Sequence, residues 1–387
     1  MVLFNRILPS IKNRGNILIS ERRGWKTDRK IVVIESDDWG SIRIPSKDAR
    51  NRLKKNGVKL NFDIGYDLYD SIATEFDLRC LMEVLDSVRD VNDNPAKITL
   101  NCVVANPDFE KIYQNNYQQY YYEIITDTFK KYKGCENSFK LWKEGISNNL
   151  FLPQFHGREH LNVPMWLNSL KNNYGSMREA FKEKVFFPQV AAFEDSRKSH
   201  LRAFDVNEKS QYVHMKRSIE EGLKIFEQLF GFKSISMIPP NYTWDYELEC
   251  YLNQNGVKYL QGNYFQRFSS LQRTLSNKEG LYHYLGEKNI LSQTYLVRNC
   301  LWEPAQNPTF NKDYTLKGIE KAFKLSKPAV ICSHRLNFIG AIEGDNRKKN
   351  LKEFSELLKE IVKRYPTVEF MSSDELGNVV TNDIVTV

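Results

Sequence analysis

Short apolar runs alternate along the chain with segments whose apolar residues recur at helical spacing. The apolar runs are typical of strands buried on both faces and lie at 31–34, 97–104, 150–155, 234–238, 257–260, 295–299, 329–332 and 368–371. The helical segments lie at 76–91, 112–132, 138–146, 163–170, 218–230, 246–255, 316–325 and 347–364. Strands that alternate with helices pair in parallel, so we expect an α/β fold with one barrel-like or doubly wound sheet.

Two segments interrupt this alternation. Residues 44–66 carry little pattern and are interpreted as a loop with a short helix. Residues 174–214 contain no clean element. No internal repeat or low-complexity linker divides the chain. We therefore expect a single domain over residues 1–387, with 174–214 as an insertion near the rim of the active site.

The first strand runs directly into the acidic pair Asp37-Asp38. Successive strand residues point to opposite faces, so both carboxylates share one site only if the chain leaves the strand there. Gly40 and Ser41 provide such a turn. An acidic pair at this position is typical of the catalytic end of an α/β barrel. The alternative is that one of the two residues caps the next helix.

Histidines follow two other strands. His156 and His160 come after the strand at 150–155, and His334 follows the strand at 329–332. A His-x-x-x-His spacing puts two imidazoles one helical turn apart, and a carboxylate from another strand would complete a zinc-type ligand set. The alternative is a pair of loop histidines with structural hydrogen bonds. The remaining histidines are interpreted as surface or structural residues: His200, His214 and His283.

Composition sets further limits. The chain has 387 residues, 41% of them apolar, which is enough for a sizeable core. A net charge of +8 suits an anionic polymer or a membrane surface, but it is too small to indicate a nucleic-acid partner. The six cysteines form no CxxC motif, which favours a reducing compartment. We see neither a signal peptide nor a transmembrane segment and expect a cytoplasmic protein.

These motifs resemble those of the NodB-type polysaccharide deacetylases. The family's strand ending in Asp-Asp is matched by Asp37-Asp38, its His-x-x-x-His pair by His156 and His160, and its last strand ending in His by His334. The third motif, an Arg-x-Pro-type turn, is matched only partly, by residues 238–242. The motifs follow the family's order over residues 31–334. The resemblance implies a distorted (β/α) barrel with one divalent metal ion.

The resemblance also implies a role for each matched residue. Asp38, His156 and His160 would bind the ion, which we expect to be Zn2+. Asp37 would act as general base and His334 as general acid in removing an acetyl group from a carbohydrate. The expected partner is thus an acetylated sugar or glycan. The kind of sugar, the choice between N- and O-acetyl groups and the oligomeric state stay open.

The chain departs from the family in two motifs. No arginine precedes Pro239-Pro240, so the residue that orients the base must come from elsewhere, and Arg298, Arg158 or Arg335 could supply it. The family's Asp-x-x-Asp-Trp motif is absent too. A segment from Arg298 to Glu303 occupies its place and puts arginine where an aspartate would sit.

Within that segment, Trp302 could form a wall of the pocket and Glu303 could adjust the pKa of His334. Aromatic rings are candidate stacking surfaces for sugars, with core packing as the competing explanation. The candidate substrate-binding residues are Trp39, Arg158, Tyr242, Trp244, Arg298 and Trp302.

Two other functions remain possible at this point. One is a glycosidase that uses two carboxylates such as Asp37 and Glu159, and it would work without metal. The other is a catalytically inactive carbohydrate-binding protein that keeps the fold. Such a protein has no need of a base and an acid on either side of a metal site, which favours the deacetylase.

Overall fold

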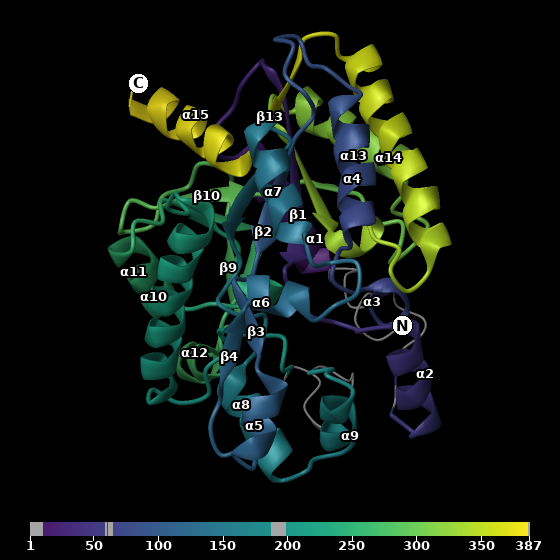
Figure 1. The fold of residues 1–387 in the computed structure, drawn as a ribbon. Coiled ribbons are helices and arrows are strands. Elements are labelled where there is room, and N and C mark those ends of the chain that lie inside the picture. Colours follow the sequence, from purple (N-terminus) through teal and green to yellow (C-terminus); the bar gives the residue numbers. More distant parts are fainter. Residues whose placement is uncertain (1–10, 59, 61–64, 187–198, 386–387) are drawn as a thin grey trace.

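A computed structural model describes residues 11–58, 60, 65–186 and 199–385 (Figure 1). Its main element is a nine-stranded sheet in which all pairings are parallel. The strands follow the order β10-β7-β6-β5-β2-β1-β12-β11, and β13 pairs with β1. Their bounds are β1 (Lys30–Trp39), β2 (Ile98–Cys102), β5 (Phe151–Phe155), β6 (Ser236–Met237), β7 (Tyr259–Gly262), β10 (Thr294–Val297), β11 (Cys300–Leu301), β12 (Ala329–His334) and β13 (Val368–Met371).

The two outer strands of the sheet, β10 and β11, follow each other directly in the chain. The sheet must therefore curl to bring its two edges together. The two residues between them connect the edges. The amide of Arg298 donates to the carbonyl of Gly262 at 2.8 Å, and the amide of Asn299 donates to the carbonyl of Val330 at 3.1 Å. This curled parallel sheet surrounded by helices is the distorted (β/α) barrel expected from the sequence.

Helices pack around the sheet, as Figure 1 shows. In α4, Leu78, Leu81 and Leu85 are fully buried, as their helical spacing predicts. The helix bounds are α1 (Ile11–Arg22), α2 (Lys47–Lys55), α3 (Gly65–Tyr69), α4 (Glu75–Asp86), α5 (Phe109–Gln114), α6 (Ile125–Lys130), α7 (Ser138–Ser147), α8 (Val163–Lys171), α9 (Met177–Lys182), α10 (Gln211–Phe230), α11 (Tyr246–Gln254), α12 (Ser270–Ser276), α13 (Lys312–Lys324), α14 (Gly344–Arg364) and α15 (Ser373–Val385). None of the described helices is long and apolar enough to cross a membrane.

The prediction of one helix over residues 112–132 is wrong. Helix α5 ends at Gln114, and a short antiparallel pair, β3 (Ala105–Pro107) with β4 (Tyr122–Ile124), occupies part of the segment before α6 begins. Asn116 and Tyr117 have φ values of 49° and 59°, which ends the right-handed helix. The tyrosine-rich sequence that follows suits a strand better than a helix interior.

The segment 174–214 is also more regular than its sequence pattern indicates. Helix α9 lies in it, with Met177, Ala180 and Phe181 buried, and α10 begins already at Gln211. Residues 187–198 lie outside the described part. That the segment is an insertion stays a prediction.

Candidate active site

The acidic pair lies at the end of β1, where the strand breaks its regular pairing. The register with β2 shifts between Ser36 and Trp39, and Asp38 has a φ of 71°. Aspartate tolerates this left-handed conformation better than most residues, and Gly40, at φ 81°, continues the turn. The irregularity resolves the problem of alternating faces, since both carboxylates reach the same end of the sheet.

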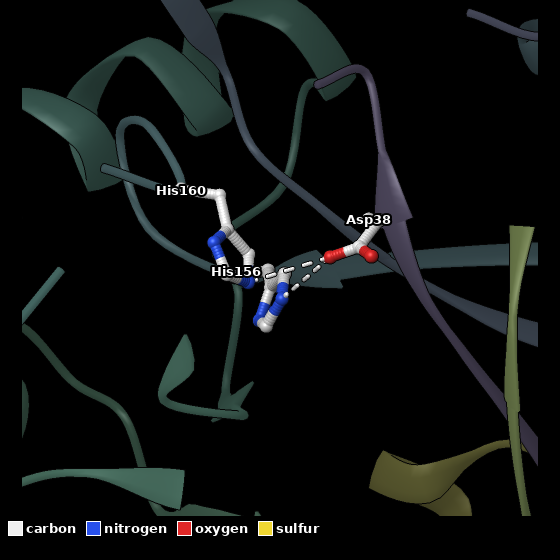
Figure 2. A group of neighbouring side chains, drawn as sticks. All are labelled: Asp38, His156 and His160. Atoms are coloured by element: carbon white, nitrogen blue, oxygen red, sulfur yellow. Dashed lines mark ion pairs between the residues drawn. The ribbon is translucent and has the colours of Figure 1, made fainter. Parts of the chain in front are cut away.

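Asp38 meets both histidines of the His-x-x-x-His motif (Figure 2). The motif lies on the loop after β5 and not on a helix, contrary to the expected helical turn. Gly157, at φ 113°, bends this loop, and the centroids of the two imidazole rings lie 5.0 Å apart. His156 is held by a hydrogen bond between its Nδ1 and the carbonyl oxygen of Ile238 at 2.7 Å.

The three side chains fit a divalent metal ion. Asp38 Oδ1 lies 3.5 Å from His156 Nε2 and 3.4 Å from His160 Nε2, and one ligand atom from each residue lies within 4.8 Å of the others. Tetrahedral bonds of ~2.0–2.1 Å place ligand atoms about 3.4 Å apart. His156 Nε2 is also buried with no hydrogen-bond partner among the described residues, which an ion would supply.

The charges of these groups suit ligation. Burial lowers the pKa of His160 to about 4, against the opposing effect of Asp38, so the ring is neutral and has a free lone pair. Burial would raise the pKa of Asp38, but His160 and His156 outweigh it and hold that pKa well below its usual range. A neutral imidazole and an ionised carboxylate are the forms that bind metal.

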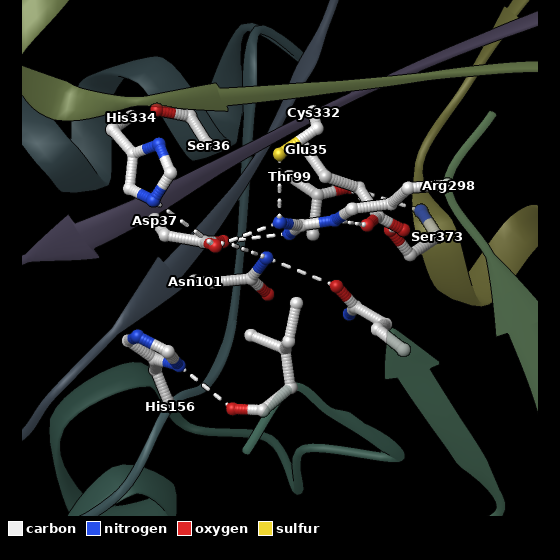
Figure 3. Close-up of polar contacts among 12 residues, drawn as sticks. Glu35, Ser36, Asp37, Thr99, Asn101, His156, Arg298, Cys332, His334 and Ser373 are labelled. Carbon is white, nitrogen blue, oxygen red and sulfur yellow. Dashed lines mark hydrogen bonds and ion pairs between the residues drawn. The ribbon is translucent and has the colours of Figure 1, made fainter. Parts of the chain in front are cut away.

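Asp37, on the other side of the turn, is held by Arg298 (Figure 3). The guanidinium donates to Asp37 Oδ2 at 2.7 Å and to Oδ1 at 2.6 Å, and Asn101 donates to Oδ1 at 2.9 Å. Burial would raise the pKa of Asp37, but the charge and hydrogen bonds of Arg298 lower it to about 2. The carboxylate is therefore ionised and fixed in orientation.

Arg298 also binds a second buried carboxylate. Its Nε donates to Glu35 at 2.5 Å, and Glu35 accepts another hydrogen bond from Ser373 at 2.7 Å. Glu35 and Asp37 lie two residues apart on β1 and so share a face of the strand. Neither carboxylate is more than 4% exposed. Burial raises the pKa of Glu35 against the opposing effect of Arg298, so one guanidinium serves two buried carboxyl groups whose pKa values move in opposite directions.

Of the three arginines proposed to replace the family's base-orienting residue, the structure places only Arg298 next to Asp37. Arg158 pairs with Glu159 at 2.7 Å and with Glu221. Arg335 pairs with Asp70 at 2.8 Å. Both pair with carboxylates other than Asp37, so Arg298 is the one of the three that contacts it.

His334 lies opposite Asp37. Its Nε2 is 3.8 Å from Asp37 Oδ2, and its Nδ1 is 2.6 Å from Glu303 Oε2. Burial would lower the pKa of His334, but Glu303 and then Asp37 outweigh it and hold that pKa well above its usual range. Glu303 is itself positioned by Asn337, which donates to its Oε1. The structure thus places Glu303 where it adjusts the pKa of His334.

The tryptophans expected to stack on sugar lie in the core instead. Trp39, Trp244 and Trp302 are at most 1% exposed. Trp39 packs on Trp142 and Phe338, and Trp302 packs on Phe338 and Phe354. Trp244 stacks on His283 and donates to Glu249. Core packing, the competing explanation, accounts for all three.

The other candidates divide between the site and the interior. Tyr242 is partly exposed, and its hydroxyl accepts from Arg298 at 3.2 Å, so it lies beside the arginine that holds Asp37. The Arg158 guanidinium pairs with the buried carboxylate of Glu159. His200 and His283 are buried structural residues and not surface ones, with hydrogen bonds to Ser169 and Gln266.

Two residues in contact with Arg298 or Asp37, Glu35 and Asn101, were not among the site residues predicted from the sequence. For Glu35, the available signal was its position two residues before Asp37, on the same strand face. Asn101 carries no such signal in the sequence, because its contact with Asp37 spans 64 residues.

Comparisons with known proteins give structural likeness only. No protein-family model and no curated protein matches the sequence. A protein described as a polysaccharide deacetylase from Mycobacterium smegmatis is 9% identical with a TM-score of 0.43, and 93% of each chain is covered. The allantoinase PuuE is 9% identical with a TM-score of 0.44, over 92% of this chain and 91% of that one.

A family 4 acetyl xylan esterase from Clostridium thermocellum, in complex with a cobalt ion, is 10% identical with a TM-score of 0.35, over 90% of this chain and 91% of that one. Polysaccharide deacetylases are thus among the solved structures that this chain resembles. At these identities and TM-scores, the chemistry must be taken from the side chains of the chain itself.

Proposed function

We propose that this chain is a metal-dependent hydrolase of the NodB deacetylase type, which removes an N- or O-linked acetyl group from a carbohydrate. The observation that carries the proposal is the placement of an ionised carboxylate, Asp37, and a cationic imidazole, His334, beside a metal-type ligand set. Such an arrangement provides a base and an acid for one reacting carbonyl group.

Asp38, His156 and His160 would hold the ion, proposed to be zinc. When bound, such an ion polarises the acetyl carbonyl and lowers the pKa of a water molecule. Asp37 then takes a proton from the attacking water. Arg298 keeps both oxygens of Asp37 in place, so little reorganisation accompanies the proton transfer.

His334 supplies the proton that the leaving atom needs. The Glu303 carboxylate at Nδ1 keeps the ring protonated and leaves Nε2 directed toward Asp37 and the reacting carbonyl. An amine leaves poorly without a proton, so this acid is needed most for N-acetyl substrates. An ester with a good leaving group needs it least.

The rival functions have less support. The glycosidase requires Glu159 as a second catalytic carboxylate, but this residue is 4% exposed and bound to Arg158 and Ser218. A binding protein would have no use for the charged pair of Asp37 and His334 beside three ligand atoms. The cytoplasmic location remains a prediction.

Two measurements together test the proposal. Elemental analysis of the purified protein should find one divalent ion per chain, and the chain should release acetate from members of a panel of acetylated sugars. His160→Ala should lose both, whereas the matched control His214→Ala should keep both. Full acetate release after chelation would refute the metal-dependent mechanism. Metal-independent release of reducing sugar without acetate would favour the glycosidase, and sugar binding without either product would favour the binding protein.

A further inference from the structure

Helix α3 lies against the strand end that carries the acid. Its first residue, Gly65, approaches so closely that an added Cβ would lie 2.3 Å from the carbonyl oxygen of Ala305. Real Cβ atoms do not come this near to an oxygen, so only glycine permits this position. The sequence pattern of residues 44–66 predicted a short helix but not this close contact of Gly65.

Two ion pairs hold the helix in place. Asp70 accepts from Arg335, the residue after His334, at 2.8 and 3.0 Å. Asp67 lies 3.7 Å from Arg43. Asp67 and Asp70 are at most 2% exposed, and breaking a buried pair is costly, so α3 is tied to the segment after β1 through Arg43 and to the end of β12 through Arg335.

This placement fixes Tyr66 beside the acid. The Tyr66 ring lies edge-on to the His334 ring, with centroids 5.4 Å apart at 88°, and the Arg43 guanidinium lies 5.3 Å from its centroid. The side chain is partly exposed. Within the described residues, its hydroxyl has no hydrogen-bond partner. Burial and the carboxylates of Glu303 and Asp38 raise the pKa of Tyr66 well above its usual value, so the hydroxyl keeps its proton.

The geometry points to Tyr66 as a substrate-binding residue, whose hydroxyl donates a hydrogen bond to a sugar hydroxyl next to the acylated atom. This inference rests on the proposed function. His334 delivers its proton to the leaving atom, and a phenol packed against that imidazole reaches atoms one or two bonds away. A packing role alone would need the ring and not the hydroxyl. The enzyme would therefore favour substrates with a hydroxyl beside the acetylated position.

The test compares Tyr66→Phe with the parent chain on two substrates, an acetylated sugar and 4-nitrophenyl acetate. The second has no neighbouring hydroxyl and a leaving group that needs no proton. A neutral hydrogen bond contributes ~0.5–1.5 kcal/mol, so kcat/KM on the sugar should fall about 2- to 12-fold. Turnover of 4-nitrophenyl acetate should not change. Tyr69→Phe, in the same helix, is the matched control and should match the parent on both.

A deoxy analogue of the sugar, lacking the neighbouring hydroxyl, gives a second measurement that needs no stable variant. The parent should lose about the same factor on the analogue, and Tyr66→Phe should not distinguish the two sugars. An equal loss on both substrates, or an unchanged rate on the sugar, would overturn the inference while leaving the deacetylase standing. A parent chain that releases acetate from no substrate would refute both.

Discussion

Changing Glu303 to glutamine tests how the acid is kept protonated. Glu303 accepts from His334 Nδ1 through one oxygen and from Asn337 through the other. A glutamine has only one acceptor oxygen. If that oxygen stays with Asn337, the amide NH2 faces Nδ1 and requires the ring to accept there, which is the neutral form. Glu303→Gln thus removes a negative charge beside His334 and disfavours the protonated form of its ring.

The size of the effect follows from the contact. Hydrogen bonds to charged groups contribute ~1.5–3 kcal/mol, and one pKa unit corresponds to ~1.36 kcal/mol, so the pKa of His334 should fall by about 1–2 units. Asp37, at 3.8 Å, remains and still favours the protonated ring. Activity requires protonated His334 and is lost as pH rises through its pKa. The basic limb of the rate profile should therefore move to lower pH.

The assay is the pH dependence of kcat/KM on an N-acetylated sugar, with the parent and Glu303→Gln both loaded with metal. We expect the basic limb to shift by about 1–2 pH units while the acidic limb stays in place. The thermal midpoint and metal content serve as controls. An unmoved basic limb in a folded, metal-loaded variant would refute the assignment of that limb to His334.

Three further substitutions separate catalysis, stability and packing. Asp37→Asn should lower kcat by roughly two or more orders of magnitude, with a full equivalent of metal retained, and unchanged turnover would remove Asp37 as the base. Arg298→Met should destabilise the fold by ~3–5 kcal/mol in denaturant titration, because Glu35 and Asp37 lose their buried counter-charge. Since Arg298 lowers the pKa of Asp37 from 3.8 to about 2, the stability that this pair contributes should be present above pH 3.8 and decline as pH falls toward 2, and Arg298→Met should abolish this decline. Trp302→Ala should lower the free energy of unfolding by ~3–5 kcal/mol, as a core truncation does, and leave KM unchanged. A raised KM with unchanged stability would instead support a role as a pocket wall.

Much of the site could be predicted from the sequence because it is built from local patterns at strand ends. Apolar runs ending in Asp37-Asp38 and His334 mark the same edge of any parallel sheet, whatever the strand order. The His156 and His160 spacing likewise keeps two rings together, although a glycine-bent loop and not a helix provides the turn. The order of these motifs was enough to indicate the deacetylase-type barrel.

The tertiary structure alone decided which distant side chains complete the site. Arg298 meets Asp37 across 261 residues, and no local pattern distinguishes it from Arg158 or Arg335. Burial and pairing make that choice, since a buried guanidinium binds whichever carboxylates the fold brings to it.

The sequence pattern also does not determine where the aromatic residues lie. The sequence alone does not distinguish a tryptophan that lines a pocket from one that fills the core, and Trp302 lies in the core. Tyr66 lies in a stretch with no periodicity and reaches His334 only because Gly65 and the Asp70–Arg335 pair fasten its helix there. Local chemistry therefore indicated the candidate reacting groups, and long-range packing determined what surrounds them.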